Sequence, residues 1–498
     1  MMKHILLFFA VVLYLPYINS FFFKQTNNLI GIADSYFSLS MTDNEINPKP
    51  ERTGLSIYRL NFKFGNKINI KEREFKHQIT YKLPLKKQQI VNKITGFYGL
   101  IGPDVNMSTV NNLFDLFIGD GNIQGAFFDK GNITVIKHFV RTDKLLYEEE
   151  NGRIPNNNFV KLVFSILNKI HLLPDIMGLA NTALLNVRNK IYALYERDQP
   201  YLLNINFAKK DITTLHKQEI PNIAHISGHS KYINNTIETI DYDVLKNQLI
   251  FYKLNSEFNT LYSHSVKTRY MPVVHDFWSS PDKIIFMDSP LVMDVENILK
   301  KSLPVLLHKK QPTFIHIVDK NTQAVETYRS NDSFYMFHYA DMVETPEKIH
   351  IYGSLYEELD FSDLNIKGIY REIIINKITK EVSISKIREL EKFDLDFPIK
   401  FGDKIVFRNI HNKTINGFVI FHKMKVIKEI IFNNLCICGE PALLYIDKMP
   451  YIVSFAYSKK QNCILFVNLF NYDKIIINVP FEFNIGFHSL FIPTPKVE

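Results

Sequence analysis

The sequence predicts an all-β fold, and three observations support this prediction. Short apolar or alternating runs with the composition of strands recur over about 400 residues, starting near residue 56. Turn signals such as Asp129-Lys-Gly and Asp319-Lys-Asn separate these runs. One segment alone shows clear helical periodicity. The pattern is typical of a sandwich, a barrel or a propeller, and the spacing of the runs does not choose among them.

The expected strands are spread over the whole body of the chain. The clearest are 133–139, 190–194, 249–252, 283–287, 313–318, 369–375, 405–408, 443–455 and 464–469. The helical segment is 159–173, where apolar residues recur every three or four positions. Packing against the body is its first interpretation. The second is an interfacial helix beside a tunnel mouth, with Lys161 and Lys169 at head-group level.

The composition excludes several classes of protein. Hydrophobic residues make up 46% of the 498 positions and charged residues 22%, which is typical of a folded globular protein rather than a disordered chain. The net charge of +8 permits peripheral contact with an anionic membrane but does not argue for nucleic acid. Three cysteines exclude a disulfide-dense scaffold. Cys436 and Cys438 have no second pair, so we expect strand residues rather than a zinc site.

The N-terminus predicts entry into the secretory pathway. Residues 1–20 have the features of a signal peptide, with a basic start at Lys3 and an apolar core from Ile5 to Pro16. An uncleaved anchor is the alternative, although the core is shorter than the roughly 20 residues of a membrane span. Residues 21–55 form a polar leader headed by three phenylalanines, which resembles a plastid transit segment. The domain prediction is therefore a signal at 1–20, a leader at 21–55 and one folded domain at 56–498.

Four of the 16 histidines lie in contexts that suggest the inner ends of strands. They follow short apolar or glycine-containing stretches and are separated by 46, 63 and 150 residues: His229, His275, His338 and His488. This spacing excludes a zinc finger, whose paired ligands are a few residues apart. Ligands scattered in this way fit the axis of a propeller, where successive blades point inward. Structural histidines without a metal are the alternative.

Several ordered motifs resemble those of one known family. They are Ile101-Gly-Pro-Asp, Gly119-Asp-Gly-Asn-Ile-Gln-Gly, Phe139-Val-Arg-Thr, Asn181-Thr-Ala-Leu-Leu, Tyr192-Ala-Leu-Tyr-Glu, His275-Asp-Phe, Phe286-Met-Asp-Ser-Pro-Leu and Gly486-Phe-His-Ser-Leu-Phe-Ile-Pro. In this order, over about residues 90–498, they resemble the carotenoid cleavage oxygenases. That family, also called the retinal pigment epithelium 65-kDa protein family, consists of non-haem iron dioxygenases.

The resemblance implies a fold and a metal centre. The fold is a seven-bladed β-propeller with long loops and a few helices that cap the active-site face. The cofactor is one Fe(II) per chain, whose ligands are the four histidines named above. Imidazole also suits zinc and copper, so the choice of iron comes from the resemblance. Three carboxylates are expected behind the ligands: Glu196 behind His275, Asp396 behind His338 and Glu440 behind His488.

Two positions depart from the family pattern. Asp396 stands where the family has glutamate, and aspartate is one methylene shorter. Either the backbone approaches His338 more closely, or that ligand is held less well. The first histidine motif is Ser227-Gly-His-Ser-Lys, and His225 lies four residues before His229. His225 is therefore the alternative first ligand.

The implied activity is oxidative cleavage of a conjugated C=C bond in a carotenoid or apocarotenoid. O₂ is the co-substrate, the products are aldehydes or ketones, and the apolar polyene would enter a tunnel lined by Phe and Tyr. Cleavage of a stilbenoid and isomerisation of a retinyl ester are alternatives within the family. The alternative from another class is a catalytically degenerate propeller that binds apolar ligands.

Overall fold

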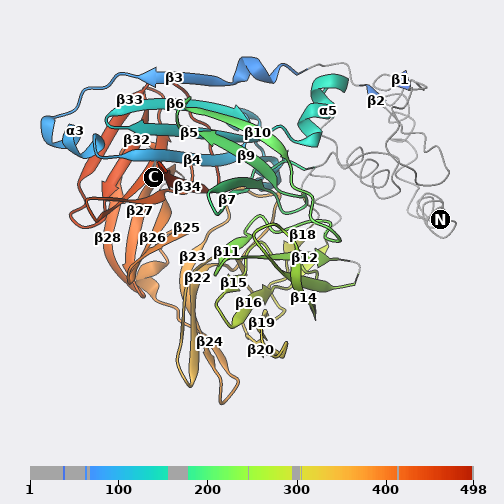
Figure 1. Ribbon diagram of the computed structural model, residues 1–498. Coiled ribbons are helices and arrows are strands. Elements are labelled where there is room, and N and C mark those ends of the chain that lie inside the picture. The colour runs from blue at the N-terminus through green and yellow to red at the C-terminus, as the bar shows by residue number, and fades with distance from the viewer. Residues whose placement is uncertain are drawn as a thin grey trace, which may run out of the picture. The chain divides into compact units, whose positions relative to one another are not determined.

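Seven antiparallel sheets of four or five strands follow one another along the described part of the chain (Figure 1). The computed structural model describes residues 68–154, 178–244, 246–293, 303, 305–411 and 414–495, and the backbone of the short strands β1 (Ser38–Leu39) and β2 (Phe62–Lys63). The predicted signal, the leader apart from β1, and the helix predicted at 159–173 lie outside the described residues. No helix within the described ranges is both long enough and apolar enough to span a membrane.

Blades 1 to 7 are defined here in chain order. Blade 1 contains β3 (Phe75–Ile79), β6 (Asn132–Phe139), β5 (Gly121–Asp129), β4 (Thr95–Pro103) and β34 (Ser489–Pro493); blade 2 contains β10 (Asp211–Lys217), β9 (Tyr201–Asn206), β8 (Lys190–Leu194) and β7 (Ala183–Val187). Blade 3 contains β11 (Lys231–Ile233), β12 (Thr236–Asp243), β13 (Gln248–Leu254) and β14 (Thr260–Lys267); blade 4 contains β15 (Trp278–Ser279), β16 (Lys283–Asp288), β19 (Phe314–Asp319) and β20 (Val325–Arg329).

The remaining blades have the same antiparallel order. Blade 5 contains β21 (Tyr335–Glu344), β22 (Lys348–Tyr356), β23 (Ile369–Asn376) and β24 (Val382–Ile384); blade 6 contains β25 (Leu395–Phe401), β26 (Lys404–His411), β27 (Thr414–His422) and β28 (Lys425–Ile431). Blade 7 contains β29 (Cys436–Ile437), β31 (Met449–Tyr457), β32 (Asn462–Asn468) and β33 (Lys474–Val479), and β30 (Ala442–Ile446) also pairs with β31. The prediction of an all-β, seven-bladed propeller is confirmed.

The long loops and capping elements of the propeller are also present. A hairpin of β17 (Leu291–Met293) and β18 (Val305–Leu307) interrupts blade 4 between β16 and β19. The helices of the described part are α3 (Leu85–Val91), α4 (Leu113–Phe117) and the 3₁₀ turns η2 (Ile70–Arg73), η3 (Met107–Thr109) and η4 (Arg388–Leu390). The helix α5 (Asp143–Asn151) belongs to a separate compact unit of the chain. The sequence predicts a few helices but does not locate these, because most of them span only one or two turns.

Two-residue turns explain why many strands pair as tight hairpins. Lys130 and Gly131 both have positive φ between β5 and β6, which suits the right-handed twist of paired strands. Asp447 and Lys448 do the same between β30 and β31, with φ of 51° and 65°. The single run predicted at 443–455 is therefore wrong: this turn divides it into two strands.

The C-terminal strand closes the ring by joining the first blade. β34 pairs antiparallel with β4, with Ser489 opposite Leu100, and the two strands lie side by side in Figure 1. Gly102 and Gly486 allow a close approach here, because a Cβ added to Gly102 would lie 2.4 Å from the Cα of Gly486. A buried apolar cluster that includes Tyr98 and Phe455 packs blade 1 against blade 7. The closure fixes the segment that carries His488.

Candidate metal centre

Four blades each bring one histidine to the propeller axis. His338 lies within β21, and His229, His275 and His488 come one to three residues before β11, β15 and β34. Each of these strands is at the edge of its sheet. The sheets therefore place side chains that are far apart in sequence at a single point. His338 and His488 are buried, and the other two are partly buried.

The imidazole nitrogens of the four histidines converge. One ligand atom from each lies within 4.8 Å of the others. The Nε2 atoms of His229 and His275 are 2.9 Å apart, and those of His338 and His488 are 3.2 Å apart. The ring planes of His229 and His488 are nearly perpendicular, at 89°. The cluster therefore presents ring nitrogens, and not ring faces, to a common centre.

Three carboxylates orient the rings from behind. The Nδ1 of His275 contacts Glu196, that of His338 lies 2.7 Å from Asp396, and that of His488 lies 3.3 Å from Glu440. An ionised carboxylate only accepts, so each Nδ1 carries the proton and each Nε2 directs a lone pair to the centre. Within the described ranges no carboxylate contacts the Nδ1 of His229. Its backbone N–H donates to Ser227 Oγ at 2.9 Å.

The electrostatics of the cluster favour neutral rings at His229 and His488. At His338 burial acts to lower the pKa, but Asp396 outweighs burial and the pKa is raised. Burial lowers the pKa of His229 well below its usual value, and the neighbouring histidines lower it further. Burial also lowers the pKa of His488, although Glu440 opposes this effect. Burial acts to raise the pKa of Asp396, but His338 outweighs it and the pKa lies well below its usual range. The Nε2 atoms of the three carboxylate-backed rings point to one centre, and a bound cation would stabilise this arrangement, so the residues present fit a metal ion.

The structure also separates the two candidate first ligands. His225 lies outside the cluster, where its Nδ1 is 3.7 Å from Asp241. His229 occupies the central position instead. Cys436 and Cys438 are free thiols outside the cluster: Cys436 lies in β29 and Cys438 directly after it. The expectation of strand residues rather than a zinc site fits this placement.

Sequence reasoning missed three residues beside the centre. Tyr356 Oη donates to Asp396 Oδ2 at 2.9 Å. The Phe397 ring lies 5.0 Å from that of His338 and 4.8 Å from that of His488. The Arg408 guanidinium also packs on this ring, 4.1 Å from its centroid. One signal was available: Arg408 is a charged residue in an otherwise buried run of β26.

One side of the centre is strongly apolar. The Phe337 ring lies 5.3 Å from the His275 ring. It belongs to a cluster built from α4, the β17–β18 hairpin and the ends of β21 and β22; its buried members include Leu113, Leu291, Leu307, Tyr335, Tyr356 and Phe361. An apolar molecule that approached the histidines here would meet few hydrogen-bonding groups.

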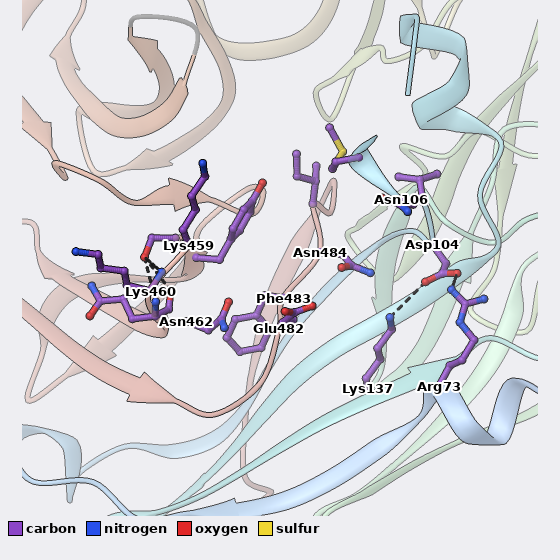
Figure 2. A pocket seen from close by; sticks show the side chains of 16 residues that line it. Arg73, Asp104, Asn106, Lys137, Lys459, Lys460, Asn462, Glu482, Phe483 and Asn484 are labelled. Atoms are coloured by element: carbon purple, nitrogen blue, oxygen red, sulfur yellow. Dashed lines mark hydrogen bonds and ion pairs between the residues drawn. The ribbon is translucent and has the colours of Figure 1, made fainter. Parts of the chain in front are cut away.

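A cavity of about 630 Å³ lies between blades 1 and 7, and none of the four histidines lines it. Figure 2 shows Arg73 and Lys137 pointing toward Asp104 on one side and the turn with Lys459 and Lys460 on the other. Lys137 Nζ is 3.3 Å from Asp104, and Arg73 contacts the same carboxylate. The lining is polar and charged, so this cavity does not match the Phe- and Tyr-lined tunnel expected for a polyene.

A ring of blades with four histidines at its axis defines a class of propeller proteins with an axial metal site. Residues 74–398 match the family model described as retinal pigment epithelial membrane protein. This match covers more than half of the chain, and the chain therefore belongs to that family. The resemblance identified from the ordered motifs is confirmed.

Named relatives support this membership. The carotenoid 9,10(9',10')-cleavage dioxygenase 1 of Phaseolus vulgaris is 25% identical over 355 residues, which are 64% of this chain and 63% of that protein. The carotenoid cleavage oxygenase 1 of Neurospora crassa is 24% identical over 217 residues, covering 42% and 40% of the two chains. The chain thus matches less than two thirds of the length of these curated relatives.

Two solved structures show the same fold. Cobalt-substituted apocarotenoid oxygenase of Synechocystis superposes with a TM-score of 0.68 at 16% identity, covering 84% of this chain and 96% of that one. The lignostilbene dioxygenase of Pseudomonas brassicacearum gives the same TM-score, identity and coverage. Because the two structures are equally similar to this chain, the fold comparison does not distinguish between their substrates.

Proposed function

We propose that the chain is an Fe(II)-dependent dioxygenase that cleaves a conjugated C=C bond of a carotenoid or apocarotenoid with O₂. The products would be two carbonyl compounds, aldehydes or ketones. The observation that carries this proposal is the convergence of His229, His275, His338 and His488 with carboxylates behind three of them. Oxygenases among the named relatives act on carotenoids, which supports this substrate class.

The four imidazoles would hold one Fe(II), which supplies the oxygen chemistry when bound. Because all four ligands are neutral, the ion would keep its full positive charge. Glu196, Asp396 and Glu440 hold the ring orientations and keep the Nδ1 protons in place. The site contains the ligands and their orienting groups, and no nucleophile–base pair is needed for the reaction.

The apolar cluster beside His275 would bind and orient the polyene. Phe337 stands between the His275 ring and the rest of the cluster, and Tyr335 and Tyr356 pack against it edge-on. Burial against these rings favours an apolar chain and keeps water away from the reacting bond. The Phe- and Tyr-lined tunnel stays a prediction that this cluster supports. Peripheral contact of the tunnel mouth with a membrane would let a water-insoluble substrate enter.

One experiment tests the function and separates it from its alternatives. The full chain is purified without oxygen, its iron is measured, and an apocarotenoid is added under air while its visible absorbance is followed. Iron with bleaching supports the proposal. Iron with cleavage of a stilbenoid alone, or isomerisation of a retinyl ester alone, supports the corresponding family alternative. No iron with retained lipid supports a degenerate, ligand-binding propeller.

A matched pair of variants assigns the first ligand in the same assay. His229→Ala removes a nitrogen from the cluster, and we expect it to abolish iron binding and bleaching. His225→Ala removes a histidine only four residues away that pairs with Asp241 instead. We expect this control to keep both properties. The opposite pattern would show that His225 is the ligand.

We also propose that residues 1–55 direct the protein into the secretory pathway and through it to a plastid. The signal-like and leader segments support this proposal, and a plastid would supply carotenoid. Fusion of residues 1–55 to a fluorescent protein in the source cells tests it. Deletion of residues 21–55 should then redirect the fusion from the plastid to the secretory route.

A further inference from the structure

Asp396 holds His338 with a shorter side chain than Glu196 and Glu440 have. Several neighbouring groups fix the position of this shorter carboxylate. Its Oδ1 lies 2.7 Å from His338 Nδ1 and accepts from the N–H of Phe397 at 2.8 Å. Its Oδ2 accepts from Tyr356 Oη at 2.9 Å. Three donors therefore fix both oxygens of the carboxylate, and the carboxylate plane cannot turn without breaking a hydrogen bond.

The backbone next to Asp396 is irregular. Phe397 has a φ of +55°, which is uncommon for a bulky residue and costs about 1 kcal/mol or more. The register between β25 and β26 shifts between Asp396 and Ile399, as it does at a β-bulge. A bulge re-aims the side chain beside it. The strained turn therefore delivers the Asp396 carboxylate to hydrogen-bonding distance.

Arg408 lies on β26, the strand that pairs with this irregular segment. It lies directly opposite Asp396 in the β25–β26 register, so the two side chains share one face of the sheet. Its guanidinium lies 4.1 Å from the centroid of the Phe397 ring, and that ring packs against His338 and His488. Arg408 is buried, and a buried cation needs a nearby carboxylate. Asp396 is the carboxylate directly opposite it on the paired strand.

We propose that Tyr356 and Arg408 are positioning residues that let an aspartate hold His338 in its metal-binding orientation. Tyr356 fixes the oxygen that His338 does not use. Arg408 lies opposite Asp396 on the paired strand, and its guanidinium packs on the Phe397 ring next to the bulge. The proposal rests on the metal site of the proposed function and adds two residues that are not ligands of the metal.

The first test removes a single oxygen atom. Tyr356→Phe should weaken the binding of Co(II), measured by competition with a chromophoric chelator, by about tenfold. The visible absorption bands of bound Co(II) should shift because the His338 ring is less fixed. Tyr370→Phe is the matched control: its hydroxyl is also buried and donates to a backbone carbonyl, that of Lys423, but it lies away from the cluster. The control should keep both affinity and spectrum.

The second test asks whether both residues act through Asp396. Arg408→Met keeps an unbranched, flexible side chain but is shorter and removes the charge, and it should lower Co(II) affinity at least as much as Tyr356→Phe. In an Asp396→Asn background, Tyr356→Phe should have less than a twofold effect, because its partner is already altered. Thermal unfolding of the metal-free variants shows whether each one folds. If Arg408→Met does not fold, the Tyr356 series still decides.

The outcomes separate this inference from the function on which it rests. Wild-type protein that binds no Co(II) overturns the metal centre, and this inference with it. Wild-type protein that binds Co(II) while Tyr356→Phe keeps its affinity and spectrum overturns the positioning role alone. An equal loss in the wild-type and Asp396→Asn backgrounds would also overturn it, because Tyr356 would then act without Asp396.

Discussion

The axial histidines and the cavity between blades 1 and 7 both gather polar groups in the protein interior, but they neutralise charge differently. In the cavity wall, Asp104 contacts both Arg73 and Lys137, so the chain supplies its own counter-charges. At the axis, three carboxylates hold the Nδ1 atoms of their imidazoles, and the four rings turn nitrogens toward one another with no carboxylate among them. The first cluster is complete as it stands. The second is complete only with a cation.

This difference teaches how a buried polar cluster indicates a ligand. Cavity volume alone does not indicate the site, because the cavity of about 630 Å³ lies away from the histidines. An imbalance between hydrogen-bond donors and acceptors does indicate a ligand, since burying a polar group without a partner costs free energy. Four tests probe the comparison, each with one variant or a pair of variants, and they are taken from the largest expected effect to the smallest.

Removal of an axial ligand should have the largest effect. His275→Ala leaves three imidazoles, and we expect metal binding and oxygenase activity to fall below detection. His316→Ala is the control, because His316 is also a buried histidine but pairs with Asp288 and Thr327 within the sheet. It should lose stability and keep the metal. Full metal content in His275→Ala would contradict the ligand assignment.

Breaking the cavity cluster should change stability without changing the metal site. Asp104→Asn leaves Lys137 buried without its carboxylate, and burial already lowers the pKa of this lysine. We expect the free energy of unfolding to fall by about 3 kcal/mol, measured by urea denaturation. Metal content should stay at the wild-type level. A parallel loss of metal in folded Asp104→Asn protein would show that the two regions are not independent.

Replacing the carboxylate behind a ligand should weaken metal binding without abolishing it. Glu196→Gln keeps the shape of the side chain but removes the charge behind His275, so we expect 10- to 100-fold weaker binding. Glu440→Gln should lie at the lower end, because the contact with His488 is longer, at 3.3 Å. Metal affinities from chelator competition check this order. Equal metal affinity in wild type and Glu196→Gln would show that the carboxylate behind His275 does not contribute to metal binding.

Much of the fold was predictable, because strand signals are local. The runs at 190–194 and 283–287 match β8 and most of β16, and their alternation and turns depend only on neighbouring residues. The pairing of β34 with β4 joins positions almost 400 residues apart, and no local pattern encodes it. The sequence reasoning did not predict this pairing, and the family resemblance supplied only the number of blades.

The candidate site was predictable only in part. The ordered motifs indicated the histidines and their three carboxylates, and the structure brings each carboxylate to its histidine. The contribution of Tyr356 and Arg408 depends on the bulge at Phe397. A positive φ at a phenylalanine is set by tertiary packing and has no sequence signal. The cluster around Asp104 was missed for a similar reason: its members are scattered along the chain.

The smallest expected effect is a pH dependence of stability that comes from the buried carboxyl of Asp394. Burial raises the pKa of Asp394 to about 6, and the nearby charge of Asp396 adds to this shift. The folded chain therefore binds this proton more tightly than the unfolded chain, whose aspartate pKa is about 3.9. Stability should fall by about 2 kcal/mol as pH rises from 4 to 6.

The variant Asp394→Asn keeps an oxygen that accepts from the Gly368 N–H, and it removes the titration. Its unfolding free energy should vary less with pH between 4 and 6, and at pH 7 it should exceed that of the wild type. Urea denaturation of the metal-free proteins at several pH values measures this. Identical pH dependence in the two proteins would show that Asp394 ionises normally.

Elemental analysis of the anaerobically purified chain tests the central claim most directly. The convergence of four neutral imidazoles predicts close to one iron atom per chain, with loss of visible absorbance when an apocarotenoid is added under air. A folded chain that takes up no iron, with His229, His275, His338 and His488 all present, would contradict the claim that this axis is a metal centre.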